Sequence, residues 1–555
     1  MGYLKLMGGT IVDPASSHAE MIGDIWICDG RIVNSPDSHL PHPVREIDCR
    51  GRVIMPGGID MHSHIVGPKV NAARTMRARL MAARSGDSLR STPEQIANPI
   101  TPSVCEVAAK YLSMGYTTVM DAAIAPSASR LVHRELEQMA GLDVGFLALI
   151  GNHEYVLQNG RRNPAEVQRF LAWLLGRCGA WGPKLANPGG VAVWKQRAQG
   201  NVRDLWEDVA GSDARPADVI RAVAEAAHHL QLPHPLHLHG LNLGIPGNWE
   251  ITLETMRLLD GWRAHLAHVQ FHSYGGGGDS EESFTSRVEP LADWINAHPE
   301  LSVDVGQVMF GETMTMTADA PLGYALSRLT GQSWYSCDIE VETGCGISPI
   351  EYKNKVAIHA WQWTIGLEWL LRVTNPWQIA LTTDHPNGGS FLTYPRIIRL
   401  LMDREFRREE FGKLPRKVRE LSPLKDLKRE YTLHEIAVVT RAGPARLLGL
   451  QNKGALTPGS DADVAVYTPD ENRETMFQFP WLVIKDGSIV VEQGEFMNFP
   501  PGKTLALSLP IDRDWEDSFS LWFNNHYSFH IDHFGQDQSE RNIYRRRCVR
   551  QEIAG

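Results

Sequence analysis

Short segments of alternating apolar and polar residues occupy both ends of the chain. At the N-terminal end they cover residues 4–12, 24–28, 31–33 and 52–55. The same pattern returns far downstream, at residues 463–467 and 482–491. Alternation with a period of two predicts strands that bury one face. We therefore predict that residues 1–55 and 441–504 pair into one small β-sandwich.

Between the two ends, the pattern changes to continuous apolar runs that alternate with helical stretches. The runs cover residues 117–120, 145–150, 235–239, 264–269, 301–305 and 379–383, with a further one around Lys184. Strands that are apolar on both faces are typical of parallel sheets covered by helices. Because no G-x-G-x-x-G follows an early run, a barrel fits better than a doubly wound sheet. The sequence predicts an α/β fold with a (β/α)8 barrel over residues 56–440.

The last segment, residues 505–555, departs from both patterns. It gathers aromatic residues and histidines at 522–530 and carries three consecutive arginines, Arg545 to Arg547. We predict that this segment is a C-terminal extension, which packs on the body of the protein or on a partner.

Composition and charge exclude several classes of protein. The 555 residues carry a net charge of −10, without an evident Lys/Arg-rich face, which argues against nucleic acid as a partner. No run of about 18 apolar residues could span a bilayer, so we expect a cytoplasmic protein with no membrane partner. The 7 cysteines never form C-x-x-C, which argues against a zinc ribbon or an iron–sulfur cluster.

Histidine, at 22 residues, is the feature that points to chemistry. Pairs of histidines stand on the strand-like runs, as in His62/His64, Leu236-His237-Leu238-His239 and His265/His268. An imidazole at the end of a buried apolar strand needs a function. Residues i and i+2 of a strand point to the same side, so His62 and His64 can hold one metal ion together.

The segment MPGGIDMHSH, from Met55 to His64, resembles the opening signature of the amidohydrolase superfamily. In that superfamily a strand leaves a small β-domain, ends in H-x-H and begins the barrel. In the binuclear branch, a carboxylated lysine from the fourth strand bridges two zinc ions, the fifth and sixth strands each give a histidine, and an aspartate ends the eighth strand. The resemblance implies two zinc ions per chain, with His62 and His64 among their ligands.

The same resemblance implies a bridging lysine before the His239 strand. The lysines between His64 and that strand are Lys69, Lys110, Lys184 and Lys195. The first two precede the second predicted strand, which leaves Lys184 and Lys195. Lys184 stands just before a Gly-rich loop, where a strand should end, and is the favoured site of N6-carboxylation; Lys195 is the alternative.

The remaining ligands are carried over from the later strands. His239 and His268 match the histidines of the fifth and sixth strands, with His237 as a second choice for the fifth. His265 and His272 are candidates for groups that support the ligands.

Asp384 ends the run 379–383 before a Gly-rich loop and matches the aspartate of the eighth strand. The implied chemistry is attack of an activated water on an amide-like carbonyl. In it, Asp384 is a metal ligand and also the catalytic acid and base. A turn-forming role before Pro386 is the alternative for this residue.

Three further stretches narrow the family: residues 187–190 (NPGG), 268–276 (HVQFHSYGG) and 382–389 (TTDHPNGG). They resemble the A subunit of formylmethanofuran dehydrogenase and its bacterial counterpart in the formyltransferase/hydrolase complex. The resemblance implies one component of a multi-subunit complex that makes or breaks the N-formyl bond between formate and a furan C1 carrier, methanofuran or methylofuran. The alternatives are a free-standing cyclic-amide hydrolase of the dihydroorotase or hydantoinase type, and a scaffold subunit with a vestigial metal site.

Overall fold

The computed structural model describes most of the chain. The described residues are 2–16, 20–36, 44–85, 100–196, 200–277, 283–317, 319–332, 335–336, 346–497, 499–527, 530–531, 535 and 548–552. Arg545 to Arg547 and part of the aromatic segment at 522–530 lie outside them. Within the described residues, no helix is long and apolar enough to cross a membrane.

Eight parallel strands form a nearly closed barrel, as predicted. They are β6 (Gly58–Ser63), β7 (Tyr116–Ile124), β8 (Asp143–Leu149), β9 (Gly182–Ala186), β10 (Leu236–His239), β11 (Ala264–Leu266), β14 (Leu301–Asp304) and β18 (Ile379–Ala380). The first and last strands meet where the His64 amide donates to the His385 carbonyl, at 2.7 Å. The predicted runs thus became consecutive barrel strands, and the α/β barrel class is confirmed.

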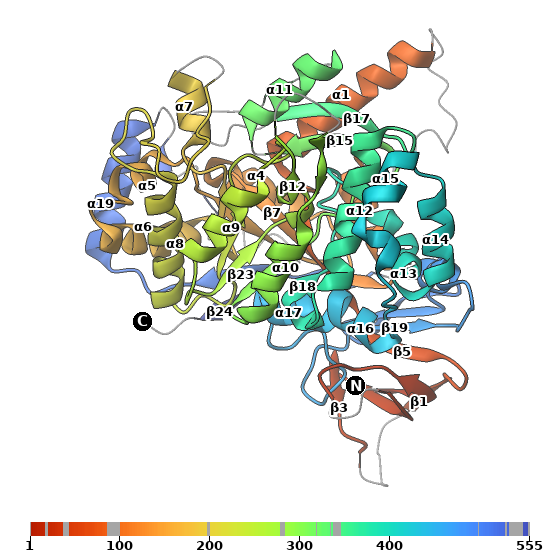
Figure 1. Ribbon diagram of the computed structural model, residues 1–555. Coiled ribbons are helices and arrows are strands. Elements are labelled where there is room, and N and C mark those ends of the chain that lie inside the picture. The colour runs from red at the N-terminus through yellow and green to blue at the C-terminus, as the bar shows by residue number, and fades with distance from the viewer. Residues whose placement is uncertain are drawn as a thin grey trace.

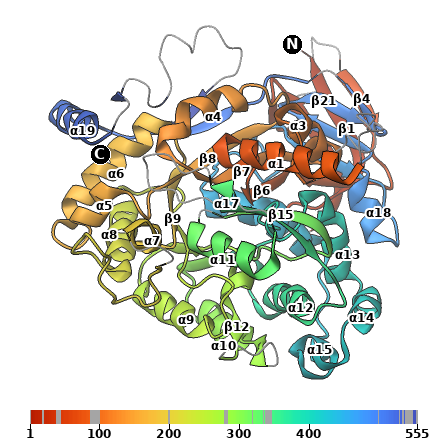
Figure 2. The ribbon, with the colours of Figure 1, turned by 90° about the horizontal axis from the view of Figure 1, so that it is seen from above.

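Helices surround these strands, as the view from above shows (Figure 2). The helices between barrel strands include α3 (Val104–Ser113), α4 (Ser129–Leu136), α6 (Pro164–Cys178), α8 (Pro216–His229), α9 (Trp249–Leu258), α10 (Val288–Ala297) and α12 (Ala357–Arg372). Their ends follow local chemistry: Ser103 and Glu106 form a capping box at the start of α3, and Pro216 opens α8.

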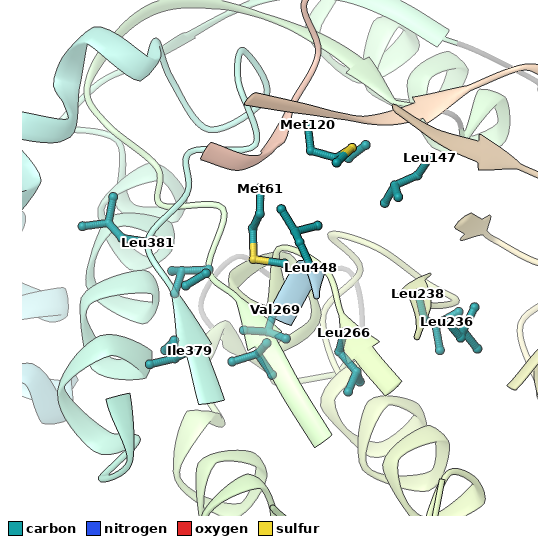
Figure 3. Close-up of a cluster of buried hydrophobic side chains, with 14 of the residues drawn as sticks. Met61, Met120, Leu147, Leu236, Leu238, Leu266, Val269, Ile379, Leu381 and Leu448 are labelled. Atoms are coloured by element: carbon teal, nitrogen blue, oxygen red, sulfur yellow. The ribbon is translucent and has the colours of Figure 1, made fainter. Parts of the chain in front are cut away.

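Apolar side chains fill the space beside the strands. Figure 3 shows ten labelled members of this cluster: Met61, Met120, Leu147, Leu236, Leu238, Leu266, Val269, Ile379, Leu381 and Leu448. Leu448 ends α17 (Gly443–Leu448), which packs against β6 and β18. Its carbonyl accepts from Trp181 Nε1 at 2.8 Å.

The two chain ends share one nine-stranded sheet, seen at the bottom of Figure 1. The N-terminal strands are β1 (Tyr3–Ile11), β2 (Met21–Cys28), β3 (Arg31–Val33), β4 (Val44–Asp48) and β5 (Val53–Pro56). The C-terminal strands are β19 (Val464–Tyr467), β20 (Leu482–Lys485), β21 (Ser488–Glu492) and β22 (Glu495–Phe496). The two groups join because β5 pairs with both β1 and β19. The sheet encloses its own apolar cluster, which includes Leu6, Ile54 and Val464.

The segment after residue 503 is attached to the barrel sheet. Strand β23 (Thr504–Ser508) pairs in parallel with β8, and β24 (Cys548–Glu552) pairs in parallel with β23. Helix α19 (Arg513–His526) packs on α6, where Phe519 contacts Phe170 and Trp173. The described parts of the C-terminal segment therefore pack on the body of the protein.

A small three-stranded sheet lies beside α1 (Gly67–Ser85) and α11 (Ala320–Thr330) at the top of Figure 1. Its strands are β15 (Gly311–Thr317), β16 (Tyr335–Ser336) and β17 (Gly346–Tyr352). Met314 and Met316 of β15 pack with Val70 and Ala73 of α1. This sheet, which the sequence patterns did not predict, covers the end of the barrel where the strands finish.

Candidate metal centre

All six predicted ligands meet in one cavity of about 120 Å³ at the carboxyl ends of the barrel strands. Each comes from a barrel strand or from the few residues after it. They are His62 and His64 (β6), Lys184 (β9), His239 (β10), His268 (after β11) and Asp384 (after β18). The carboxyl face of such a barrel is where its active sites are built.

His62, His64 and Asp384 form the tightest group. Asp384 Oδ1 lies 3.1 Å from His62 Nε2 and 3.0 Å from His64 Nε2. These atoms are close enough together to hold one metal ion. The spacing of the two histidines on β6, with the aspartate opposite, thus produces the arrangement that the H-x-H motif predicts.

Lys184, His239 and His268 line the other side of the cavity. The ring centroids of His239 and His268 are 4.7 Å apart, and that of His268 is 5.2 Å from His62. Lys184 is 2% exposed, and burial lowers the pKa of its amine to about 7. Lys195, the alternative, is exposed on α7 (Gly190–Gln196) and does not line the cavity.

Several of these side chains carry buried polar atoms that have no hydrogen-bond partner. Among the described residues, five such atoms belong to this group: His62 Nε2, Lys184 Nζ, His239 Nε2, His268 Nδ1 and Asp384 Oδ1. An unsatisfied buried polar atom costs about 1–3 kcal/mol, so five in one cavity fit a site built for a bound group. Imidazole nitrogens with a carboxylate oxygen are the ligands that zinc takes in hydrolases. The residues present fit a zinc site.

The protonation states of three of these groups also suit metal binding. Burial lowers the pKa values of His239 and His268, which keeps both imidazoles neutral. Burial opposes ionisation of Asp384, but the charge of His62 and the close contacts with His62 and His64 outweigh it and hold the pKa of this carboxyl well below its usual value. Neutral imidazole and ionised carboxylate are the forms that bind metal.

The backbone at this face is strained at two of the predicted ligands. His268 has φ 35° and Asp384 has φ 49°, in the left-handed region that non-glycine residues seldom occupy. Gly306 follows β14 between them; a Cβ there would lie 2.5 Å from the Cβ of His268 and 3.5 Å from the Cβ of Asp384. Strain of this kind gathers at functional sites, and Gly306 provides the room for it.

The histidines predicted to support the ligands lie around the cavity and not on its wall. His237 Nε2 is 3.3 Å from His62 Nδ1, and His265 Nε2 is 3.1 Å from Asp304 Oδ2. The ring of His272 stacks on that of His268, with centroids 5.4 Å apart. Of the pair His237 and His239, only His239 lines the cavity.

Sequence reasoning missed the acidic and basic residues that contact the ligands. Lys69 Nζ lies 2.8 Å from His64 Nδ1, Asp319 Oδ2 lies 3.7 Å from His239 Nε2, and Asp304 contacts His62. Asp304 ends β14, within the predicted run 301–305, so its place near a strand end, like that of Asp384, could have indicated it. Asp319 and Lys69 follow no such pattern, because both come from outside the barrel strands.

The rest of the cavity wall is mainly apolar. Its other residues are Ala123, Ala186, Leu243, Gly244, Phe271, Leu322, Ile350 and Ile358, with the polar Thr315, Thr317, Tyr352, Gln362 and Asn387. Several come from β15, β17 and α11, so the small sheet at the barrel mouth forms part of the wall. Such a pocket accepts a small, largely apolar ring beside the predicted ligands.

The chain belongs to the amidohydrolase family, which it matches over residues 45–491. It is 36% identical to protein FwdA of Methanocaldococcus jannaschii over 98% of both chains. It is also 37% identical, over 96% of both chains, to the A subunit of the formyltransferase/hydrolase complex Fhc of Methylorubrum extorquens. The crystal structure of that complex, FhcABCD with methylofuran, contains a chain that matches with a TM-score of 0.90 and 34% identity over 100% of both chains. The predicted resemblance to these A subunits is confirmed.

Proposed function

We propose that this chain makes or breaks the N-formyl bond of a formylated furan C1 carrier of the methanofuran or methylofuran type, releasing formate when it runs as a hydrolase. The observation that carries the proposal is the six-residue centre, in a chain that matches the A subunit of a methylofuran complex along its whole length. By the same likeness, it works as one component of a multi-subunit complex.

The donor set supports two zinc ions. His62 and His64 would hold one ion and His239 and His268 the other, with Asp384 as a further ligand. Lys184, with its buried Nζ between these groups, would bridge them after N6-carboxylation, because a carbamate offers two oxygens where an amine offers one nitrogen. When bound, the two ions polarise the formyl carbonyl and lower the pKa of water.

Asp384 is the residue proposed to move the proton. Its carboxylate is ionised and 3% exposed, and it faces the cavity in which the formyl group would lie. It accepts a proton from the attacking water and delivers this proton to the amine nitrogen as the C–N bond breaks. In the reverse direction, Asp384 takes the proton from the amine.

The apolar wall gives the substrate its place. Leu243, Phe271 and Ile350 line the cavity beside the predicted ligands, and they would pack on a furan ring and exclude water from it. This packing would hold the carrier's amine at Asp384, so that the ring positions the reacting bond.

A cyclic-amide hydrolase is the weaker proposal. Dihydroorotases match only short segments, for example 35% identity over 15% of this chain, against 98% for FwdA. A match of this length reflects the shared family alone.

The test uses the full-length chain with the subunits that copurify with it. We expect formate release from a formylated furan amine, no turnover of dihydroorotate or hydantoin, two zinc equivalents per chain, and a mass increase of one CO₂ on Lys184. Turnover of the cyclic amides alone would contradict the substrate class. Less than one zinc per chain, with no activity, would favour a scaffold role.

A further inference from the structure

Asp304 lies beneath the metal centre and has no role in the proposed chemistry. It ends β14 and is fully buried, and its strand neighbours are β11 and β18, which carry His268 and Asp384 at their ends. Each of its two carboxylate oxygens contacts a different part of the centre.

One oxygen, Oδ2, faces imidazoles. It lies 2.9 Å from His62 Nδ1 and 3.1 Å from His265 Nε2. An ionised carboxylate only accepts hydrogen bonds, so the proton of His62 must sit on Nδ1. The lone pair of His62 is then on Nε2, which points at Asp384 Oδ1 across 3.1 Å. With no proton on either atom, His62 Nε2 and Asp384 Oδ1 cannot form a hydrogen bond with each other. Both can instead bind the same cation.

The other oxygen, Oδ1, faces donors from two further strands. It accepts from the backbone amide of His268 at 3.1 Å and from Thr382 Oγ1 at 2.6 Å. The bond to His268 comes at the residue with φ 35°, a conformation that costs on the order of 1–3 kcal/mol unless its surroundings hold it. Asp304 therefore contributes to holding His268 in this turn.

We propose that Asp304 is the positioning residue of the metal centre: it fixes the tautomer of His62 through one oxygen and the backbone of His268 through the other. The inference rests on the metal binding in the proposed function. One side chain would thus orient both His62 and His268 for metal binding, although the two histidines come from different strands, β6 and β11.

Asp304→Asn tests this with almost no change in shape. An amide has one acceptor and one donor end, so it cannot accept from both sides. If its NH₂ faces His62, the ring must present Nδ1 as an acceptor and protonate Nε2, which can then no longer bind a metal. If the NH₂ faces His268 instead, it meets the backbone N–H of His268, and two donors cannot form a hydrogen bond with each other. Either way, we expect zinc affinity at the centre to fall roughly 10- to 100-fold.

Thr382→Val is the matched control. It removes one hydrogen bond to Oδ1 and the acceptor of the Gly306 amide, so it costs stability but leaves the bond from Asp304 to His62 intact. We expect this variant to hold zinc as the parent does. Asp304→Ser is a second, smaller variant with the same expected loss as Asp304→Asn, because one hydroxyl cannot reach both sides.

The measurement is the zinc retained by the full-length proteins across a series of chelator concentrations, with the thermal midpoint as the check of folding. Loss of zinc in both Asp304 variants but not in Thr382→Val supports the inference. If the Asp304 variants retain zinc like the parent, or if Thr382→Val loses it equally, Asp304 is not the positioning residue and the proposed function stands. A parent that holds no zinc overturns both.

Discussion

Two groups of buried charged and polar side chains lie at opposite ends of β8 and its neighbours, and they differ in how they are satisfied. At the carboxyl ends of the strands, the six-residue centre leaves several atoms without partners. At the other end, Asp143 begins β8 and meets Lys453, Lys485 and Asp463, which belong to the chain around the nine-stranded sheet. Both groups are buried. In the first, five atoms have no hydrogen-bond partner among the described residues, whereas in the second the carboxylates and ammonium groups form ion pairs with one another.

Ion pairs connect the side chains of the second (bottom) group, at the start of β8. Lys453 Nζ lies 2.6 Å from Asp143 and 2.7 Å from Asp463, and Lys485 Nζ lies 3.1 Å and 3.0 Å from the same two carboxylates. Asp143, Asp461 and Asp463 are close enough to hold a metal ion, but the two ammonium groups already lie among them. The ion pairs of the second group therefore join the barrel to the nine-stranded sheet, whereas the atoms without hydrogen-bond partners in the first group are those predicted to bind metal.

The largest effect should follow from removing a predicted metal ligand at the carboxyl ends of the strands. His62→Ala or His64→Ala should lose zinc and abolish hydrolysis, because no neighbour at strand spacing can replace a neutral imidazole. Zinc content and formate release measure the two effects, and the thermal midpoint checks that the barrel is intact. Full activity in either variant would show that the paired spacing has no metal-binding role.

Asp384→Asn should separate chemistry from binding. The amide keeps the size and one acceptor but cannot take a proton, so turnover should fall about 10⁴-fold or more while zinc largely remains. The readouts are kcat and zinc content on the same preparation. Retained turnover would refute the acid/base role, and a variant that fails to fold would favour a turn-forming role before Pro386.

Lys184→Ala should lose the bridge between the two halves of the centre. Small carboxylic acids added in solution should restore part of the activity, because a short carboxylate can occupy the space left by the side chain. Formate release with increasing acetate measures the rescue. Lys195→Ala is the control: Lys195 is exposed on α7, so its loss should be mild. The opposite result would move the bridging role to Lys195.

The sequence patterns predicted the barrel strands because a continuous apolar run is a local signal. The six site residues came from the resemblance to amidohydrolases, which could be applied because the last residues of each run mark the carboxyl face on which His62, His239 and Asp384 lie. Asp319 contacts His239 from the segment after β15. The spacing of apolar residues in the sequence does not predict this contact. The pairing of β23 with β8 is also non-local. Residues 504 and 144 are far apart in the sequence, and no sequence pattern indicates that their strands become neighbours in the folded barrel.

The bottom group was missed for a related reason. Asp143, Asp463 and Lys485 are far apart in the chain, and each alone reads as an ordinary surface charge near a turn. These side chains are buried because the barrel contacts the nine-stranded sheet. The apolar and polar pattern of a single strand does not predict that contact. The strand-end position of Asp304 can be seen in the sequence, but its partners cannot, because they come from β6 and from the segments after β11 and β18.

Asp143→Asn should lower stability without touching the metal centre. It leaves the buried ammonium groups of Lys453 and Lys485 short of one negative charge, and breaking a buried pair in this way costs about 3–5 kcal/mol. Denaturant unfolding measures the loss, and zinc content should match the parent. Loss of zinc in this variant would mean that the two ends of the barrel are coupled and that the contrast between them fails.

The smallest expected effect is the acid sensitivity of the bottom group. Burial alone would raise the pKa of Asp143, but Lys453 and Lys485 lower it to about 2. Because this folded value lies below the unfolded one, the stabilisation is complete above about pH 4 and is lost as the pH falls toward 2, roughly 2 kcal/mol in all. Thermal midpoints of the parent should therefore drop over this window. In Asp143→Asn the starting midpoint should be lower and the drop shallower, because the residue no longer titrates; an equally steep drop would assign the acid sensitivity to other carboxylates.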